Sequence, residues 1–503
     1  MKEKLYSLYR DRVDNVCKTL HWPTALAQLS ANRARTPQRE SDRSLNALDA
    51  AIMYMAVCST TPPECEAWFF ESKAALVSQA RASAEAQLAR SRLLQTPDIV
   101  TLQAFVIYLQ AHRSCQNYAS SWTLLAIAVR VASTLGLGSE NAENYDVTDL
   151  EIRRRLWYTI CLLDTQGVLD RGSAPLIALS EMGLAPKDTN DANVSCSQLP
   201  IVATGELTEM SFALMTHEAM ICQRKLCELS SGGPHDDWAG WKTKMVILAE
   251  FKQHYNEKYI TVDPATTTPL RNFMVAGART ISNTMTLITR RPPYRQQSNC
   301  APPGDDFDSL EASTRILESH LEIDTAQNSP WSWKSWVPWY AIAAVLAELC
   351  RRPQDPMAER SLRAACEVFQ QHATPASDPE SGILWRPIAK LLKRVQRLRR
   401  NDAAGTPSTG QGSSSMSPDN TNEPCVAGHI RLGACDDEII APTRNDPGAH
   451  DETPFDALDM SIFDDLMGSS NLPYNLPGTD IGESWLDWDL LMQQELDYPF
   501  AQP

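Results

Sequence analysis

An abrupt change in composition and charge near residue 400 limits most strongly how this chain of 503 residues folds. Beyond that point nineteen Asp and Glu residues stand against two basic residues, Arg431 and Arg444, whereas the first 400 residues hold 44 basic and 43 acidic ones. A segment whose charges have one sign repels itself and resists packing. The sequence therefore predicts a near-neutral packed body and an acidic tail with a different task.

The tail itself divides into two kinds of sequence. Residues 401–424 are rich in Ser, Gly, Pro and Asn, so they bury too little apolar area to offset the entropy lost on ordering. Past residue 451 large apolar residues return, interleaved with Asp and Glu, which is typical of disordered activation segments. We therefore expect a helical body at 1–400, a disordered linker at 401–450 and an acidic, aromatic activation-type tail at 451–503.

The body shows the apolar period of helices along its length. We expect Thr96 and Pro97 to begin one helix as its N-cap and first residue, and Thr148 with Glu151 to begin another through a capping box. Weaker helical periods follow at 207–229, 238–259, 270–289, 309–324, 336–351, 359–372 and 387–400. Because neither a βαβ alternation nor a long period-2 run is present, the expected fold class is all-α, a multi-helical domain followed by a disordered acidic tail.

Cysteine usage and hydropathy indicate the compartment. The thirteen cysteines are odd in number and irregularly spaced, as expected for reduced thiols inside a cell. The N-terminus is charged from Lys2 onward and has no apolar run of signal-peptide length. Charged residues such as Arg130 and Glu348 interrupt the most apolar stretches, so we expect no membrane segment. The cytosol or the nucleus is the expected location.

Four stretches of the body carry a family likeness. Residues 9–24, 101–110, 120–138 and 151–177 resemble, in order and spacing, the middle domain of fungal-specific transcription factors. The most specific piece is the Arg-Arg-Arg-Leu-Trp run at 153–157 followed by Leu163 and Asp164. The resemblance covers roughly residues 5–201 and fades toward residue 400. It implies a multi-helical regulatory domain, a nuclear location and transcription regulation, with control of a secondary-metabolite gene cluster as the expected biological role.

The resemblance also implies a domain that this sequence does not contain. Members of the family usually place a binuclear zinc cluster of six cysteines before the middle domain, where paired thiolates hold zinc and a basic loop contacts DNA. Nothing of that kind precedes Tyr9, and no Cys-x2-Cys pair occurs in the chain. Either the regulator has no DNA-binding domain of its own, or the gene model lacks a first exon. We expect indirect or weak DNA binding, through a homodimer or a heterodimer with a DNA-binding regulator.

No motif points to catalysis or to a cofactor. The sequence lacks a Gly-x-Ser-x-Gly elbow, a His-Glu-x-x-His pair, a phosphate loop and a dinucleotide fingerprint, and its nine histidines are dispersed. We therefore predict no catalytic, metal-binding or cofactor-binding residues. Two alternatives to an activator stay open: a non-activating sensor or co-regulator that recruits or sequesters a DNA-binding partner, and an enzyme with an unrecognised site.

Two clusters in the body have competing interpretations. Arg153, Arg154 and Arg155 can contact phosphate, but a solvated or salt-bridged helix face is the favoured interpretation. The tryptophans at 331, 333, 336 and 339 can line a ligand pocket, but we favour a role in anchoring a helix to the core.

The last predicted helix of the body has a basic face and an apolar face. Its apolar residues, Leu391, Leu392, Val395 and Leu398, form a stripe that can close the domain. Its basic face is a candidate nuclear-localisation signal. The residues of that signal are Lys390, Lys393, Arg394, Arg397, Arg399 and Arg400.

The tail contains the candidate activation motif, which we expect to bind transcription coactivators. Its first apolar cluster recurs at helical spacing, so it can fold as an amphipathic helix in a partner's groove while neighbouring Asp residues steer the encounter. A second cluster, richer in tryptophan, follows. The candidate residues are Phe455, Leu458, Ile462, Phe463 and Leu466 in the first cluster and Trp485, Trp488 and Leu491 in the second.

Overall fold

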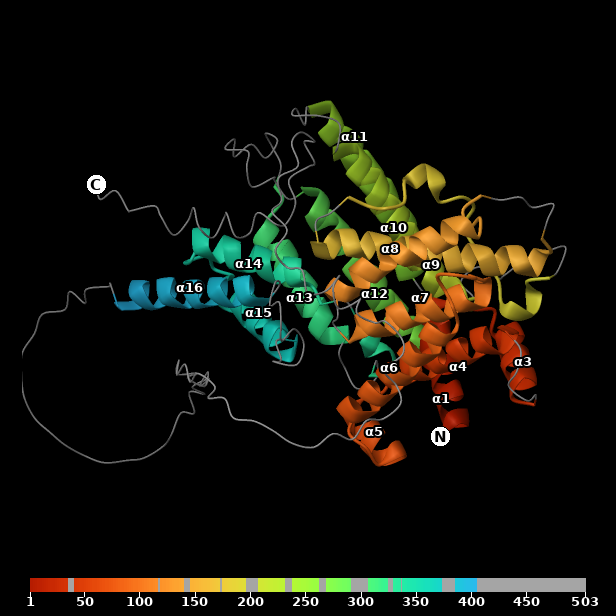
Figure 1. The fold of residues 1–503 in the computed structure, drawn as a ribbon. Helices are drawn as coiled ribbons and strands as arrows, with labels where there is room; N and C mark the ends of the chain where they lie inside the picture. Colours follow the sequence, from red (N-terminus) through yellow and green to blue (C-terminus); the bar gives the residue numbers. More distant parts are fainter. Residues whose placement is uncertain are drawn as a thin grey trace, which may run out of the picture. The chain divides into compact units, whose positions relative to one another are not determined.

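The computed structural model describes one compact body within the chain (Figure 1). The described residues are 1–34, 40–115, 118–139, 145–171, 174–195, 207–230, 238–261, 268–290, 306–323, 329–335, 337–372 and 385–404. Every regular element among them is helical and none is a strand, so the all-α prediction is confirmed for this part of the chain. The predicted linker and tail lie outside it, apart from residues 401–404, which continue the last helix.

The helical elements fall into three groups along the chain. The first group comprises α1 (Lys2–Leu8), η1 (Tyr9–Asp14), α2 (Asn15–Cys17), α3 (Trp22–Arg33), α4 (Glu40–Cys58), α5 (Pro62–Phe69), α6 (Lys73–Arg90), α7 (Ile99–Ser114), α8 (Tyr118–Thr134) and α9 (Val147–Arg171). The middle group comprises η3 (Leu179–Glu181), η4 (Asp191–Asn193), α10 (Ser211–Ser230), α11 (Trp238–Tyr255), η5 (Asn256–Ile260) and α12 (Pro269–Arg290). The last group comprises α13 (Ser309–Ile323), η7 (Ser329–Lys334), α14 (Trp339–Arg351), α15 (Ala358–His372) and α16 (Trp385–Ala404).

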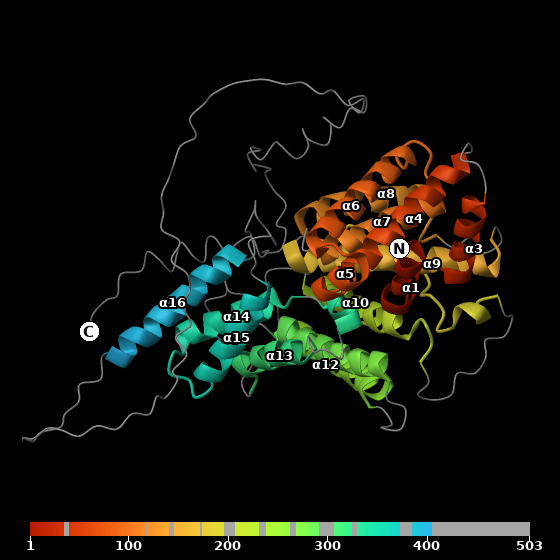
Figure 2. The same cartoon turned by 90° about the horizontal axis from the view of Figure 1, so that it is seen from below.

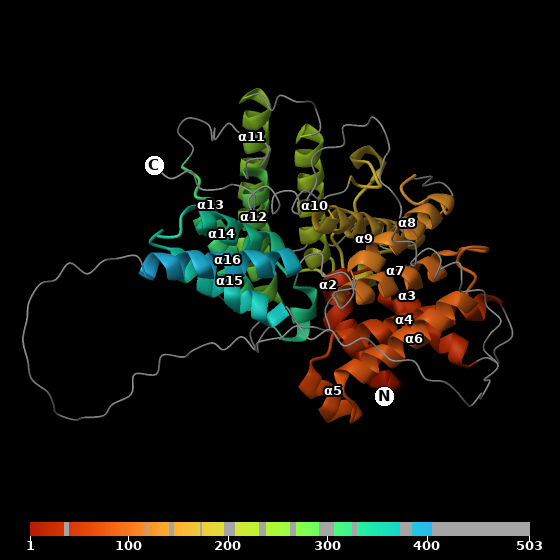
Figure 3. The same ribbon diagram turned by 60° about the vertical axis from the view of Figure 1, so that its left-hand side comes forward.

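The buried apolar residues form two main cores. The larger core is built by α1 to α12 and includes Leu48, Leu102 and Leu156. The smaller core joins α13, α14, α15 and α16 and includes Leu346 and Val395. Helix α12 contributes to both, because Met274 and Met285 lie in the first core and Leu287 lies in the second. Figure 2 shows α12 beside α13, and Figure 3 shows α10, α11 and α12 between the N-terminal helices and the group from α13 to α16.

Two predicted helix starts are wrong by a few residues, and side-chain hydrogen bonds explain both. Helix α7 begins at Ile99 after the N-cap Asp98, whose Oδ1 accepts a bond from the Thr101 N–H at 2.7 Å, so Thr96 and Pro97 lie before the helix. Helix α9 begins at Val147, and Asp146 Oδ1 accepts the Asp149 N–H at 2.7 Å. A carboxylate satisfies the exposed N–H groups of a first turn and suits the positive end of the helix dipole. Glu151 therefore does not cap this helix, and its carboxylate is available for other hydrogen bonds.

The tryptophan cluster anchors short segments to the two cores, as expected. Trp331 and Trp333 of η7 pack against the larger core, where the Trp331 ring stacks on Phe273 at 5.8 Å between centroids. Trp339 begins α14 and is buried in the smaller core. Trp336 lies outside the described residues. The anchoring interpretation is therefore confirmed for the three tryptophans that the structure describes.

Candidate functional site

The most specific sequence signature, the arginine run in α9, leads to a charge centre inside the body. The Arg155 side chain is fully withdrawn from water, at 0% exposure. Its Nε donates to Glu151 Oε1 at 3.1 Å, and its Nη1 donates to Asp191 Oδ1 at 2.6 Å and to the Leu20 carbonyl at 3.2 Å. One guanidinium thus joins α9, η4 and the segment that follows α2.

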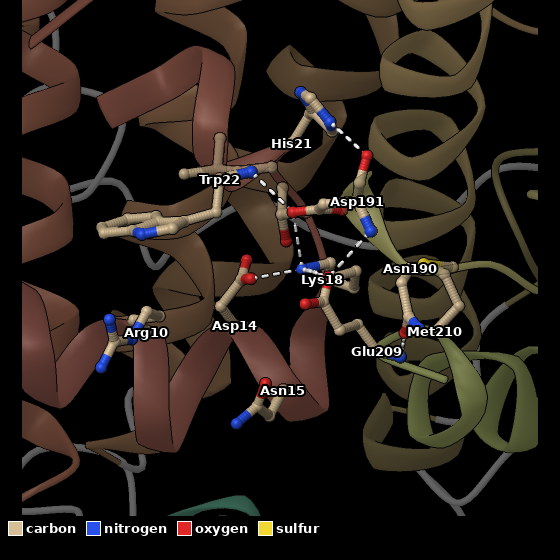
Figure 4. A network of polar contacts seen from close by, with 12 residues as sticks. Arg10, Asp14, Asn15, Lys18, His21, Trp22, Asn190, Asp191, Glu209 and Met210 are labelled. Atoms are coloured by element: carbon tan, nitrogen blue, oxygen red, sulfur yellow. Dashed lines mark hydrogen bonds and ion pairs between the residues drawn. The ribbon is translucent and has the colours of Figure 1, made fainter. Parts of the chain in front are cut away.

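A lysine completes this centre from the N-terminal segment (Figure 4). The Lys18 side chain is 1% exposed, and its Nζ lies 2.5 Å from Asp14 Oδ2 and 2.9 Å from Asp191 Oδ2. A third carboxylate, Glu209 Oε2, lies 3.1 Å from the same Nζ and is partly open to solvent. We call Asp14, Lys18, Glu151, Arg155 and Asp191 the ion-pair centre.

Asp191 is the junction of the ion-pair centre. Besides the bonds from Lys18 and Arg155, its Oδ2 accepts the backbone N–H of Trp22 at 3.0 Å. Its own N–H donates to Glu209 Oε2 at 2.9 Å, and its carbonyl lies 3.1 Å from His21 Nε2. These bonds hold the entry to α3 against η4 and against the segment before α10.

Burial and neighbouring charges in the ion-pair centre shift the pKa values of Asp14 and Asp191. Burial raises the pKa of Asp14 to about 6, although Lys18 opposes the shift. Burial also favours the neutral form of Asp191, but the neighbouring Lys18 and Arg155 outweigh it and hold the pKa of that carboxyl below its ordinary value. Two cations and three buried carboxylates thus pair with one another, although Asp14 Oδ1 and Arg155 Nη2 have no hydrogen-bond partner among the described residues. The centre links η1, the end of α2, α9 and η4 through buried charges.

A second buried pair explains the Leu163-Asp164 part of the signature. Arg224 of α10 donates from Nη2 to Asp164 Oδ2 at 2.9 Å and from Nε to Thr165 Oγ1 at 2.7 Å. The two oxygens of Asp164 also accept the backbone N–H groups of Leu176 and Ile177, each at 3.1 Å. The pair therefore fixes the path of the chain after α9 against α10.

Arg153 and Arg155 of the run differ in their surroundings. Arg153 is half-buried, donates to the Leu135 carbonyl and to the Tyr145 hydroxyl at 2.8 and 2.7 Å, and covers the Tyr145 ring at 4.0 Å. Arg155 is salt-bridged, which is one of the two arrangements expected for this run, and its side chain is buried. The reason is that α9 packs against α7, α8 and α10, so that one face of the run is enclosed.

Sequence reasoning missed most of the ion-pair centre. Asp14 and Lys18 are four residues apart, as are Glu151 and Arg155, and this spacing is typical of ion pairs on a helix. The pattern was therefore readable in the sequence. Burial of both pairs, and their meeting at Asp191, depends on long-range packing that no local pattern contains.

The candidate nuclear-localisation helix shows both of its predicted faces. Its apolar residues Leu391, Leu392 and Val395 are buried in the smaller core, so this helix closes the body. Lys390, Lys393 and Arg397 are exposed on the opposite side, whereas Arg394 and Arg399 are half-buried. Arg399 pairs with Glu359 of α15 at 2.8 Å, and the side chain of Arg400 lies outside the described residues.

The remaining predictions fall outside the described part of the chain or concern absences within it. All eight candidate activation residues, from Phe455 to Leu491, lie outside it. Within the described ranges no group of three or more His, Cys, Asp or Glu side chains is placed to hold a metal ion. The same ranges contain no helix that is both long and apolar enough to cross a membrane.

The geometry so far defines an all-helical domain whose signature residues build the interior of the fold. Residues 6–198 match the family described as fungal specific transcription factor domain. The chain thus carries a fungal-specific transcription factor domain, and that family consists of transcription regulators and not of enzymes. The resemblance drawn from the sequence is confirmed, including its extent to near residue 200.

Curated relatives extend the likeness over most of the chain. The C6 finger domain transcription factor adaR of Aspergillus niger is 29% identical over 482 residues, which cover 90% of this chain and 60% of that protein. The C6 finger domain transcription factor nscR of Arthroderma gypseum is 31% identical over 400 residues, which cover 76% of this chain and 55% of that protein. The nscR protein of Aspergillus fumigatus is 28% identical and covers 78% and 52%. The chain therefore spans less than two thirds of the length of these relatives.

Proposed function

We propose that the chain is a nuclear regulator of transcription that controls a secondary-metabolite biosynthetic gene cluster in a fungus, as an activator or co-regulator. The observation that carries the proposal is the match of residues 6–198 to the fungal specific transcription factor domain. The likeness to the transcription factors adaR and nscR over 76–90% of the chain supports it.

In this proposal the helical body is the regulatory part. The ion-pair centre and the Arg224–Asp164 pair fix α9 to the N-terminal segment and to α10, so a signal received at one of these elements is transmitted through rigid contacts to the others. The body then supports a homodimer, or a heterodimer with a regulator that binds DNA. Because residues 1–503 contain no Cys-x2-Cys pair, we propose that this stretch reaches DNA weakly or through that partner.

In this proposal the basic face of α16 and the acidic tail have separate roles, in nuclear import and in activation. The exposed basic residues of α16 serve nuclear import, since Lys390, Lys393 and Arg397 form a charged face on a helix whose other side is held in the core. The acidic, aromatic tail at 451–503 recruits coactivators. The competing proposal, a non-activating module that recruits or sequesters its partner, keeps the body and the import helix but gives the tail no activating role.

The proposed role is tested by deleting the gene in its host fungus and comparing transcript levels genome-wide. We expect the transcripts of one contiguous biosynthetic gene cluster to fall and the product of that cluster to disappear. Reintroducing the full chain should restore both. A deletion strain with no change in any such cluster would contradict the proposed role. A strain in which the transcripts of one cluster rise would favour the non-activating alternative.

A further inference from the structure

Two cysteine thiols from different helices meet where α4 and α7 end. Cys58 is the last residue of α4, and Cys115 is the C-cap residue of α7, the helix that packs along α4. Their sulfur atoms are 3.5 Å apart. A disulfide requires about 2.0 Å between the sulfurs and a short distance between the Cβ atoms, so the pair lies within a small displacement of bonding.

The position of the two cysteines favours that displacement. Each stands at the C-terminal end of its helix, where the last turn moves at a lower free-energy cost than the helix interior. Cys58 is 3% exposed, whereas Cys115 is half-buried. A small oxidant in water therefore reaches Cys115 first, and Cys58 lies behind it.

The surroundings distinguish the two sulfurs chemically. Hydrogen bonds from the Cys58 thiol and the Tyr54 hydroxyl, together with the nearby charge of Lys73, lower the pKa of Cys115. The Tyr54 hydroxyl lies 3.9 Å from Cys115 Sγ, and Lys73 Nζ lies 3.4 Å from the Cys58 carbonyl oxygen. Burial raises the pKa of Cys58 well above its ordinary value. The lowered pKa favours the thiolate at Cys115, and the raised pKa favours the protonated thiol at Cys58.

We propose that Cys58 and Cys115 form a reversible disulfide, in which Cys115 reacts with a peroxide to give a sulfenic acid and the Cys58 sulfur then displaces the hydroxyl group of that acid. This site adds an oxidant-sensitive input to the body and goes beyond the proposed role in transcription. The covalent bond ties the end of α4 to the end of α7.

The reaction has two steps, one at each sulfur. The Cys115 thiolate attacks one peroxide oxygen, so that the O–O bond breaks, a sulfenic acid forms on Cys115, and an alcohol or water leaves after taking up a proton. The Cys58 sulfur then attacks the Cys115 sulfur, the S–O bond breaks, and water leaves with the proton of the Cys58 thiol. In total two thiols give two electrons to one peroxide. A dithiol reductant reverses the reaction.

The test treats the reduced full chain with hydrogen peroxide, blocks the remaining thiols by alkylation and analyses the peptides by mass spectrometry without reduction. We expect a peptide pair joined through Cys58 and Cys115, lighter by two hydrogens, that dithiothreitol separates. Cys366 of α15 is the internal reference because it is also half-buried while burial and its acidic neighbours raise its pKa. Cys115 should react at least about tenfold faster than Cys366 at neutral pH, since a thiol of ordinary pKa is only a few per cent ionised there.

Two single substitutions assign the order of the steps. In Cys58→Ser, which changes a sulfur to an oxygen of similar size, the Cys115 sulfenic acid should persist and be captured by dimedone. In Cys115→Ser both the sulfenic acid and the cross-link should disappear. The matched control Cys366→Ser should leave the cross-link unchanged. The proposal is overturned if the parent chain forms no Cys58–Cys115 peptide, or if Cys115 reacts no faster than Cys366.

Discussion

Arg155 and Asp191 meet at 2.6 Å in the interior of the body, although 36 residues separate them in the sequence. Their side chains are 0% and 5% exposed, so neither charge is solvated if the other is removed. A broken buried ion pair is costly because the remaining charge stays unpaired in a medium of low polarity. Removing either partner of this pair is therefore expected to destabilise the fold.

Replacing Arg155 by Met should accordingly destabilise the body far more than replacing its neighbour Arg153 by Met. We expect Arg155→Met to lower the free energy of unfolding by about 3 kcal/mol or more, because Glu151 and Asp191 lose a buried partner. Arg153 is half-buried and its partners reach water, so Arg153→Met should cost about 1 kcal/mol or less. Urea unfolding followed by circular dichroism measures both values. Equal losses for the two variants would show that burial of Arg155 contributes nothing.

The raised pKa of Asp14 predicts a pH dependence of a defined sign. A carboxyl with a folded-state pKa of about 6 binds more protons in the folded than in the unfolded chain between pH 4 and 6. This group therefore adds stability below its unfolded pKa, and that stability is lost as pH rises through about 6. Asp191, whose pKa is lowered, acts in the opposite sense, as do the buried histidines His217 and His320, which resist protonation.

Comparison with Asp14→Asn isolates the contribution of Asp14. The charged neighbours Lys18, Arg155 and Asp191 stay in place in both proteins, so their own titration largely cancels in the difference. We expect the parent to exceed the variant in stability by about 1 kcal/mol more at pH 5 than at pH 7.5. Urea titrations of both proteins at the two pH values measure this difference. A difference that is larger at pH 7.5 would mean that Asp14 is ionised at lower pH than the buried geometry implies.

Replacing glycine by alanine should have opposite effects on stability at Gly138 and at Gly277. Gly138 has φ +90°, and a Cβ there would lie 3.0 Å from the Trp157 ring and from the Glu181 carbonyl, so Gly138→Ala should cost about 2 kcal/mol. Gly277 lies inside α12, where the nearest atom to an added Cβ is Met215 Cε at 3.7 Å. Gly277→Ala should therefore stabilise the body by about 0.5 kcal/mol. Thermal unfolding of the two variants should shift in opposite directions.

How much of this molecule is readable from its sequence depends on the range of the interactions concerned. Amphipathic periods are local, so the all-α class and the buried stripe of α16 follow from spacing alone. Capping is also local, but a threonine and an aspartate lie within a few residues of each other at both helix starts. The aspartates, Asp98 and Asp146, accept the N–H groups of the first turns in place of the expected threonines. The meeting of Lys18 with Asp191 and of Cys58 with Cys115 depends on packing between distant segments. The periodic pattern of apolar residues in a sequence does not predict such long-range contacts.

If the basic face of α16 is the import signal, removing its positive charge should reduce nuclear import without changing the stability of the body. Changing Lys390, Lys393 and Arg397 together to Gln leaves the buried stripe intact, so the helix content should stay the same. The nuclear fraction of a fluorescent full-chain fusion should fall severalfold. As a control, changing the exposed Arg315, Arg351 and Arg363 to Gln removes equal charge from neighbouring helices. If both triple variants lose nuclear signal equally, total charge is responsible and α16 is not the import signal.

The proposed activation motif lies in the tail at 451–503. In the segment from Phe455 to Leu466, apolar residues recur at spacings that would place them on one helical face. We expect the interleaved Asp residues to repel one another and to keep the free segment unfolded. Folding is therefore expected to accompany binding of a coactivator. Phe463→Ala with Leu466→Ala should remove most reporter activation by the full chain fused to a neutral DNA-binding domain, because each buried apolar anchor contributes about 1 to 3 kcal/mol.

The matched control for this variant changes charge and keeps the apolar face. Asp464→Asn with Asp465→Asn should reduce activation less, since these carboxylates speed the encounter more than they strengthen the final contact. Protein levels are equalised by immunoblot so that the comparison reports activity. If the double Ala variant activates as well as the parent while deletion of residues 485–500 silences it, the activation site is the second cluster around Trp485 and Trp488. If neither change reduces the output, the acidic tail only solubilises the chain, and the non-activating alternative explains its presence.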